Sequence, residues 1–147
     1  MRENAFNLIG PVDDAAVLDL FAGSGAMGLE ALSRGAATAT FVEQDRDACR
    51  VINANLDRLG LHATVLCQDA LRALAQDRGR YDLVLCDPPY GFDEQRLAPL
   101  LANLLEPDGL LVWETSGRAG PPSVPGLTLR TTRVYGSARL TLFETRP

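Results

Sequence analysis

Two short motifs, each directly after an apolar run, contain residues that could bind a ligand and act on it. The first, Gly23-Ser24-Gly25-Ala26-Met27-Gly28, has GxGxxG spacing, and Glu43 lies 20 residues beyond Gly23. Glycines allow a tight turn that a ligand can approach closely, and a carboxylate at this distance can accept hydrogen bonds from ribose hydroxyls. The spacing predicts a site for an adenosine-containing ligand, either a nicotinamide dinucleotide or S-adenosylmethionine (AdoMet).

Three features favour AdoMet over a dinucleotide. Asp19 precedes the glycines by four residues, where an anion would repel a pyrophosphate but attract an ammonium or a sulfonium. Asp69 can accept from an adenine amine, and the only histidine, His62, offers no base for hydride transfer. An NAD(P)-linked oxidoreductase stays an alternative. The predicted cofactor-binding residues are Asp19, Phe21, Ala22, Gly23, Ser24, Gly25, Glu43, Gln44, Gln68, Asp69 and Ala70.

The second motif, Asp87-Pro88-Pro89-Tyr90, is predicted to hold a target amine. Two prolines make a rigid turn, so the Asp87 carboxylate and a fixed carbonyl can each accept one N–H of an exocyclic amine. Held in this way, the nitrogen becomes pyramidal and its lone pair points at a methyl donor. Tyr90 is expected to stack on the base. Cys86 is not expected to be a nucleophile, because the neighbouring carboxylate raises the pKa of its thiol.

The elements that position these motifs alternate between strand and helix. Strands are predicted at 16–21, 38–42 with Glu43 at the end, 63–67, 81–86 and 110–113, and helices at 26–32, 45–59, 69–74 and 97–104. Asp45 and Asp69 are expected to cap their helices, and Pro99 is expected to delay the start of the last one. Segments 127–134 and 138–143 indicate a closing hairpin. The pattern predicts an α/β fold with a parallel sheet, one antiparallel edge and helices on both faces.

Composition excludes several other chemistries. The chain has 147 residues, 46% of them apolar, and a net charge of −5, which fits a single domain (1–147) without a strongly basic surface for nucleic acid. All 14 basic residues are arginine, so lysine-dependent catalysis and a lysine phosphate-binding loop are excluded. Three cysteines without CxxC spacing are expected to be buried and reduced, with no metal site. No signal sequence or membrane span is apparent, and a cytoplasmic location is expected.

The sequence resembles the RsmD-type methyltransferases over essentially its whole length. Residues 18–36, LDLFAGSGAMGLEALSRGA, resemble the opening motif of that family, and Asp87-Pro88-Pro89-Tyr90 matches its amine-binding turn. Arg2-Glu3-Asn4-Ala5-Phe6-Asn7 and the segment from Tyr135-Gly136 to Phe143 resemble its N-terminal motif and closing hairpin. Members usually carry a basic stretch before the N-terminal motif, and this chain is expected to lack that arm.

The resemblance implies a Rossmann-like class I fold with a seven-stranded sheet and an antiparallel last strand. It implies methyl transfer from AdoMet to the N2 amine of a guanine in bacterial 16S rRNA, within a small-subunit particle, by a monomer without a metal. An amino-methyltransferase acting on DNA or another RNA, and an AdoMet-binding module without activity, are the alternatives.

The resemblance also assigns roles to individual residues. Asp19 and Gly23 to Gly25 would line the methionine end of AdoMet, Glu43 would hold the ribose, and Asp69 the adenine amine with Gln68 beside it. Asp87 and Pro88 would hold the target amine, Tyr90 would stack on the base, and Phe6 and Asn7 would help to close the pocket.

Overall fold

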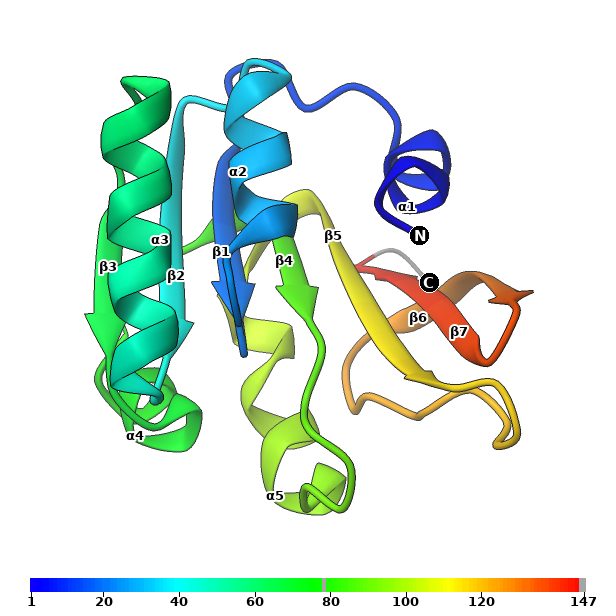
Figure 1. Ribbon diagram of the computed structural model, residues 1–147. Coiled ribbons are helices and arrows are strands. Elements are labelled where there is room, and N and C mark those ends of the chain that lie inside the picture. The colour runs from blue at the N-terminus through cyan, green and yellow to red at the C-terminus, as the bar shows by residue number, and fades with distance from the viewer. Residues whose placement is uncertain (78, 146–147) are drawn as a thin grey trace.

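The computed structural model describes residues 1–77 and 79–145, which form a seven-stranded mixed sheet with helices on both faces (Figure 1). The strand order is β3-β2-β1-β4-β5-β7-β6, in which β7 is antiparallel to both of its neighbours. The predicted fold class is therefore confirmed. The elements are α1 (Arg2–Ile9), β1 (Ala16–Leu20), α2 (Ala26–Ser33), β2 (Thr38–Glu43), α3 (Arg46–Leu59), β3 (Thr64–Cys67), α4 (Ala70–Gln76), β4 (Tyr81–Cys86), α5 (Glu94–Leu97), the 3₁₀ turns η1 (Ala98–Leu100) and η2 (Ala102–Leu104), β5 (Leu105–Ser116), β6 (Thr128–Tyr135) and β7 (Ala138–Glu144).

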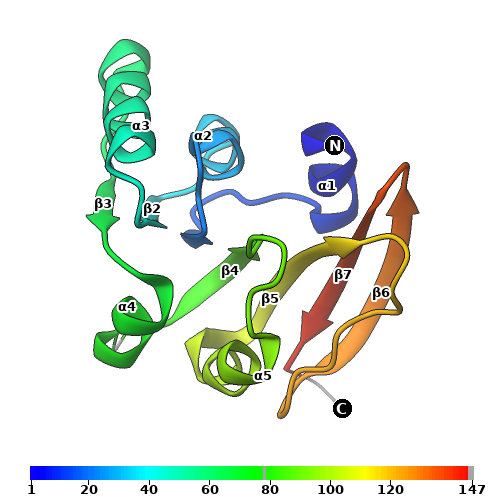
Figure 2. The ribbon, with the colours of Figure 1, turned by 60° about the horizontal axis from the view of Figure 1, so that its bottom comes forward.

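Side chains that alternate along the strands form a separate core on each face of the sheet. Val17, Leu83 and Leu85 pack with residues of α1, α2 and α3, whereas Leu18 and Val84 pack with residues of α4 and α5. Figure 2 shows α1, α2 and α3 on one side of the sheet and α4 and α5 on the other. Because both faces are covered, the inner strands are apolar throughout, which explains the short apolar runs in the sequence.

The order of the strands places a crevice between β1 and β4. The chain leaves β1 through α2 toward β2 and β3, then returns through α4 to β4 on the opposite side of β1. Connections that diverge from neighbouring strands leave an opening at the carboxyl ends of those strands, where ligands of such sheets bind. Both sequence motifs follow the strands at this edge. No helix within residues 1–77 and 79–145 has the length and apolar character needed to cross a membrane.

Local predictions of helix starts are confirmed where a side chain provides the cap. Asp45 accepts a hydrogen bond from the Ala48 N–H at 3.2 Å, and Asp69 accepts from the Arg72 N–H at 3.0 Å. Each carboxylate satisfies a backbone donor that has no partner within the first turn of its helix.

Four local expectations are wrong. The helix expected at 97–104 is instead α5, which begins earlier at Glu94, followed by two 3₁₀ turns that accommodate Pro99. Helix α1 was not predicted, and its Phe6 is buried in the core instead of closing the pocket, with the Arg34 guanidinium 4.8 Å from its ring centre. Cys49 and Cys86 are buried as expected, but Cys67 is exposed. Strand β5 extends well beyond the predicted 110–113, because Leu105 pairs with β4 before that segment and Glu114 to Ser116 pair with β7 after it.

Candidate active site

The glycine loop turns sharply after β1 and is fastened to the end of β2. Phe21 adopts a left-handed backbone with φ 58°, and Gly25, at φ 83°, precedes the first residue of α2. A left-handed conformation strains a bulky residue by about 1–3 kcal/mol, and such strain is typical of functional sites. The Gly23 N–H donates to Glu43 Oε1 at 2.9 Å, and the Asp45 N–H donates to Glu43 Oε2 at 2.9 Å. Glu43 thus holds the loop, and each of its oxygens keeps a lone pair for a ligand hydroxyl.

Asp19 lies beneath this loop and is almost fully buried, with 4% of its surface exposed. Its Oδ2 accepts a hydrogen bond from the Gly28 N–H at 3.0 Å. A Cβ on Gly28 would lie 2.8 Å from Phe41 Cζ and 3.0 Å from Asp19 Oδ2, so only glycine lets α2 approach the sheet this closely. Asp19 therefore fixes the start of α2 against the sheet.

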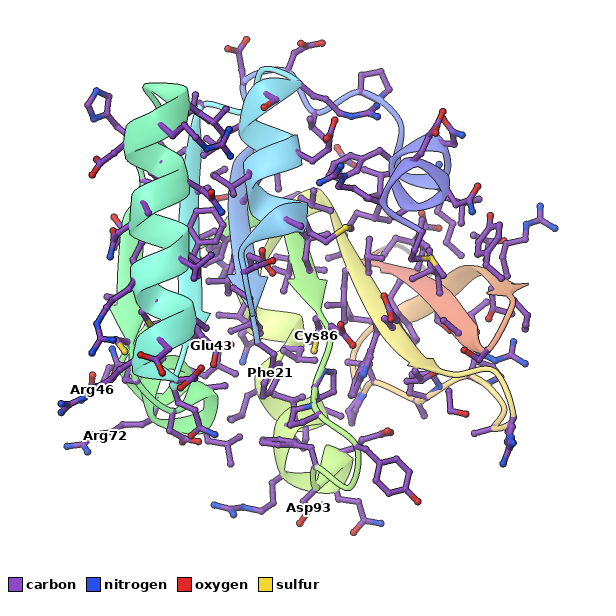
Figure 3. All side chains as sticks on the ribbon, viewed as in Figure 1. Phe21, Glu43, Arg46, Arg72, Cys86 and Asp93 are labelled. Carbon is purple, nitrogen blue, oxygen red and sulfur yellow. The ribbon has the colours of Figure 1, made fainter. Side chains whose placement is uncertain are left out.

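A cavity of about 260 Å³ opens at the carboxyl ends of β1, β2, β3 and β4. Figure 3 shows Phe21 and Glu43 at this edge, while the side chains of Arg46 and Arg72 point away from it. The charged groups in its wall are therefore carboxylates. The lining residues are Phe21, Val42, Glu43, Gln44, Asp45, Gln68, Asp69, Ala70, Asp87, Pro89 and Phe92.

The second motif contributes to the same cavity through two of its four residues. Asp87 and Pro89 lie in the wall, whereas Pro88 does not. The Tyr90 side chain is fully exposed and does not line the cavity. The aromatic residue that does is Phe92, whose ring meets Phe21 edge to face with centroids 4.9 Å apart. Tyr90 therefore stands outside the cavity, and the aromatic rings in its wall are those of Phe21 and Phe92.

Burial raises the pKa of two acidic groups at this edge, Asp19 and Asp87. The pKa of Asp19 rises to about 8, chiefly through burial and further through the charges of Asp87 and Glu43, although the Gly28 hydrogen bond lowers it. The pKa of Asp87 rises to about 6 through burial and then the charge of Glu114. Burial, followed by the charge of Asp87, also raises the pKa of the Cys86 thiol well above its usual value. Asp87 is therefore ionised at neutral pH, and Cys86 is a buried thiol unsuited to nucleophilic attack.

The structure brings most of the predicted site residues together. Eight of them line the cavity, and Ala22, Gly23, Ser24 and Gly25 form the loop at its edge, with Asp19 below. Sequence reasoning missed Val42, Asp45 and Phe92. The first two adjoin Glu43 in the chain, so their position at a strand end could have identified them. Phe92 lies in a loop, and no signal in the sequence pointed to it. No three His, Cys, Asp or Glu side chains gather as metal ligands within the described residues.

The cavity fits AdoMet in the chemistry of its wall. Phe21, Val42 and Phe92 offer apolar surface for a purine ring, and Asp69 Oδ1 can accept from the adenine amine while Oδ2 caps α4. Glu43 lines the same cavity, and its carboxylate can accept hydrogen bonds from a ribose diol. Four carboxylates without a lining arginine suit a ligand that carries a sulfonium and an ammonium, and they disfavour a pyrophosphate. The donor set therefore agrees with AdoMet and opposes the dinucleotide alternative.

Comparisons with known proteins agree with this site. The family model described as conserved hypothetical protein 95 matches residues 1–144. Ribosomal RNA small subunit methyltransferase D of Escherichia coli (strain K12) is 39% identical over 98% of this chain and 76% of its own length. The solved structure of Escherichia coli yhhF superposes with a TM-score of 0.91 at 37% identity, covering 99% of this chain and 86% of that one. A conserved hypothetical protein of Streptococcus pyogenes also gives 0.91, at 35% identity. The chain therefore belongs to the conserved hypothetical protein 95 family, the RsmD family of AdoMet-dependent methyltransferases.

Proposed function

We propose that this chain transfers a methyl group from AdoMet to the exocyclic N2 amine of a guanine in bacterial 16S rRNA. The observation that carries the proposal is the position of Asp87, which lines the same cavity as Glu43 and Asp69. The residue expected to hold the amine therefore borders the cofactor site directly. A relative that matches nearly the whole chain is named for small-subunit rRNA methylation, which indicates the substrate.

The problem that the site must solve is the weak nucleophilicity of an aromatic amine. The lone pair of such a nitrogen is delocalised into the ring, and two acceptors that hold both N–H bonds favour a pyramidal nitrogen with a localised lone pair. The Asp87 carboxylate is one acceptor, and the carbonyl of Pro88, fixed by the two prolines, is the other. When bound, AdoMet supplies an electrophilic methyl group on a positively charged sulfur.

The remaining residues orient and protect the reactants. Phe21 and Phe92 form an apolar wall beside Asp87, so water is displaced from the point where the new N–C bond forms. The amine loses one proton as this bond forms, and the Asp87 carboxylate is the group in the turn that can accept it. Glu43 and Asp19 position the glycine loop through the Gly23 and Gly28 N–H groups. We propose roles in cofactor binding for both, through the ribose hydroxyls and the ammonium.

The experiment that tests the function is methyl transfer from tritiated AdoMet to 16S rRNA that lacks the modification. Free rRNA and assembled small-subunit particles are compared, because we propose a particle as the substrate and a cytoplasmic monomer as the enzyme. The labelled base is then mapped and identified. N2-methylguanine in 16S rRNA is the expected product. Label in another base refutes the assignment and supports a different amino-methyltransferase. AdoMet binding without any transfer also refutes it and supports an inactive binding module.

A further inference from the structure

Four neighbouring strands each bring an acidic residue to the carboxyl edge of the sheet. In spatial order these are Glu43 on β2, Asp19 on β1, Asp87 directly after β4, and Glu114 on β5. The first three belong to the loop and cavity described above. Glu114 is not among the lining residues of the cavity, so it lies beyond Asp87 on the side away from the cofactor.

Glu114 and Asp87 lie at neighbouring register positions, next to the pair that joins the end of β4 to β5. Cys86, labelled in Figure 3 at the end of β4, pairs with Trp113 on β5. Asp87 follows Cys86 directly after β4, and Glu114 follows Trp113 on β5. Glu114 pairs with Leu140 across β7, and Leu140 packs in the same core as Leu85, two residues before Asp87. The two carboxylates therefore project from the same face of the sheet, side by side. The effect of the Glu114 charge on the pKa of Asp87, second to burial, agrees with this proximity.

The Glu114 carboxylate has no evident structural task. It is half-buried, and no hydrogen bond joins it to another side chain or backbone group in the part of the chain that the structure describes. Burial raises the pKa of Glu114, and the attraction of the Met1 ammonium opposes that rise. A half-buried carboxylate without a hydrogen-bonding partner in the protein keeps its lone pairs available to a donor on a ligand.

The chemistry of the bases identifies that donor. A carboxylate only accepts hydrogen bonds. Among the three bases with an exocyclic amine, guanine alone has a ring N–H beside it; adenine at N1 and cytosine at N3 present a lone pair that a carboxylate repels. We propose that Glu114 accepts a hydrogen bond from N1–H of the target guanine while Asp87 holds the adjacent N2 amine, and that this second carboxylate selects guanine over the other amino bases. This inference rests on the proposed function. It adds the choice of base, which the Asp-Pro-Pro-Tyr turn alone does not specify.

The test compares guanine with 2-aminopurine at the mapped position, in 16S rRNA ligated around a synthetic fragment and assembled into particles. 2-Aminopurine keeps the N2 amine but carries a lone pair at N1. Since a hydrogen bond to a charged group contributes about 1.5–3 kcal/mol, the preference of the native protein for guanine in kcat/KM should include a factor of about 10 to 150 from Glu114. Glu114→Gln should lower the guanine to 2-aminopurine ratio by at least about 10-fold, because the Gln amide can donate to the N1 lone pair.

Matched controls separate recognition from a general defect. Glu106→Gln changes the same residue type on the same strand at the opposite end of the sheet, and it should leave the ratio unchanged. AdoMet affinity, measured by calorimetry, should be equal in all three proteins and reports that each is folded. A ratio that stays at its native value in the Glu114→Gln variant overturns the inference, as does a native protein that methylates both bases equally. A product other than N2-methylguanine in the native protein instead refutes the proposed function.

Discussion

The buried carboxyl of Asp19 predicts an unusual dependence of stability on pH. Asp19 lies on β1 between Phe41 of β2 and Leu85 of β4, and its pKa rises from 3.8 to about 8, mainly because burial penalises the charge. Between these two values the folded protein keeps the Asp19 proton and the unfolded chain does not. The folded state therefore binds more protons, and its stability must fall as pH rises through this window.

The magnitude follows from linkage. Each pH unit inside the window costs about 1.4 kcal/mol of the free energy of unfolding, so Asp19 alone removes about 3 kcal/mol between pH 5 and pH 7. Asp19→Asn removes this dependence of stability on pH, because asparagine does not titrate. The Asn side-chain oxygen can still accept a hydrogen bond from the Gly28 N–H. We expect the stability advantage of the variant over the native protein to be larger by about 3 kcal/mol at pH 7 than at pH 5.

The assay is urea unfolding of the protein without cofactor, at constant ionic strength, at several pH values between 5 and 7. Asp82→Asn is the matched control, because Asp82 also accepts a backbone N–H, from Ala16 at 2.8 Å, but is exposed to water. The control should leave the slope of stability against pH as it is in the native protein. Parallel slopes for Asp19→Asn and the native protein would refute the reasoning, since they would mean that Asp19 is ionised in the fold at neutral pH.

Three further predictions concern the site. Asp87→Ala should lower methyl transfer by at least about 100-fold while AdoMet affinity, measured by calorimetry, stays nearly unchanged; lost binding in the folded variant would contradict a role toward the amine. In the native protein kcat should fall as pH drops below about 6, because protonated Asp87 no longer accepts two hydrogen bonds freely, and a profile that is flat down to pH 5 would exclude this. Gly28→Ala should destabilise the protein by up to about 2 kcal/mol in urea unfolding, because overpacking against Phe41 costs about 1–3 kcal/mol and the gain in helix propensity offsets only about 1 kcal/mol. Ser33→Ala in the same helix should have little effect.

What could be predicted from the sequence depended on whether the signal was local. The caps Asp45 and Asp69 were predictable because the residue type and the apolar spacing that follows it lie within one turn of helix. Helix α1 buries only Ala5 and Phe6, and it does so in a core shared with α2 and the sheet, so its own apolar pattern is weak. A tertiary contact, not a local pattern, also determines that Phe92 lines the cavity.

The site shows the same division. Asp19, Glu43 and Asp87 could be placed from their positions after predicted strands, because the carboxyl ends of parallel strands meet at one edge. The left-handed backbone of Phe21, which brings its ring toward Phe92, follows from the closure of the glycine loop onto Glu43. Residue type alone predicts a negative φ at Phe21, since aromatic residues rarely adopt positive φ. The exposure of Tyr90 was likewise unpredictable, because a Pro-Pro turn fixes the path of the backbone but not which of its side chains faces inward.

The distribution of charge explains how an acidic chain can act on a polyanion. Nineteen acidic residues against 14 arginines give the net charge of −5. Six of the acids, Asp19, Glu43, Asp45, Asp69, Asp87 and Glu114, stand at or beside the carboxyl edge; without them, 13 acidic residues remain against 14 arginines. The excess formal negative charge therefore belongs to this edge, where Asp19 keeps its proton in the protein without cofactor and the other carboxylates can accept from the proposed ligands, a cationic cofactor and the N1–H and N2 donors of guanine. Such a site repels phosphates and attracts the adjacent N1–H and N2 donors of guanine, so we expect recognition to depend on the base and the shape of the RNA more than on its backbone charge.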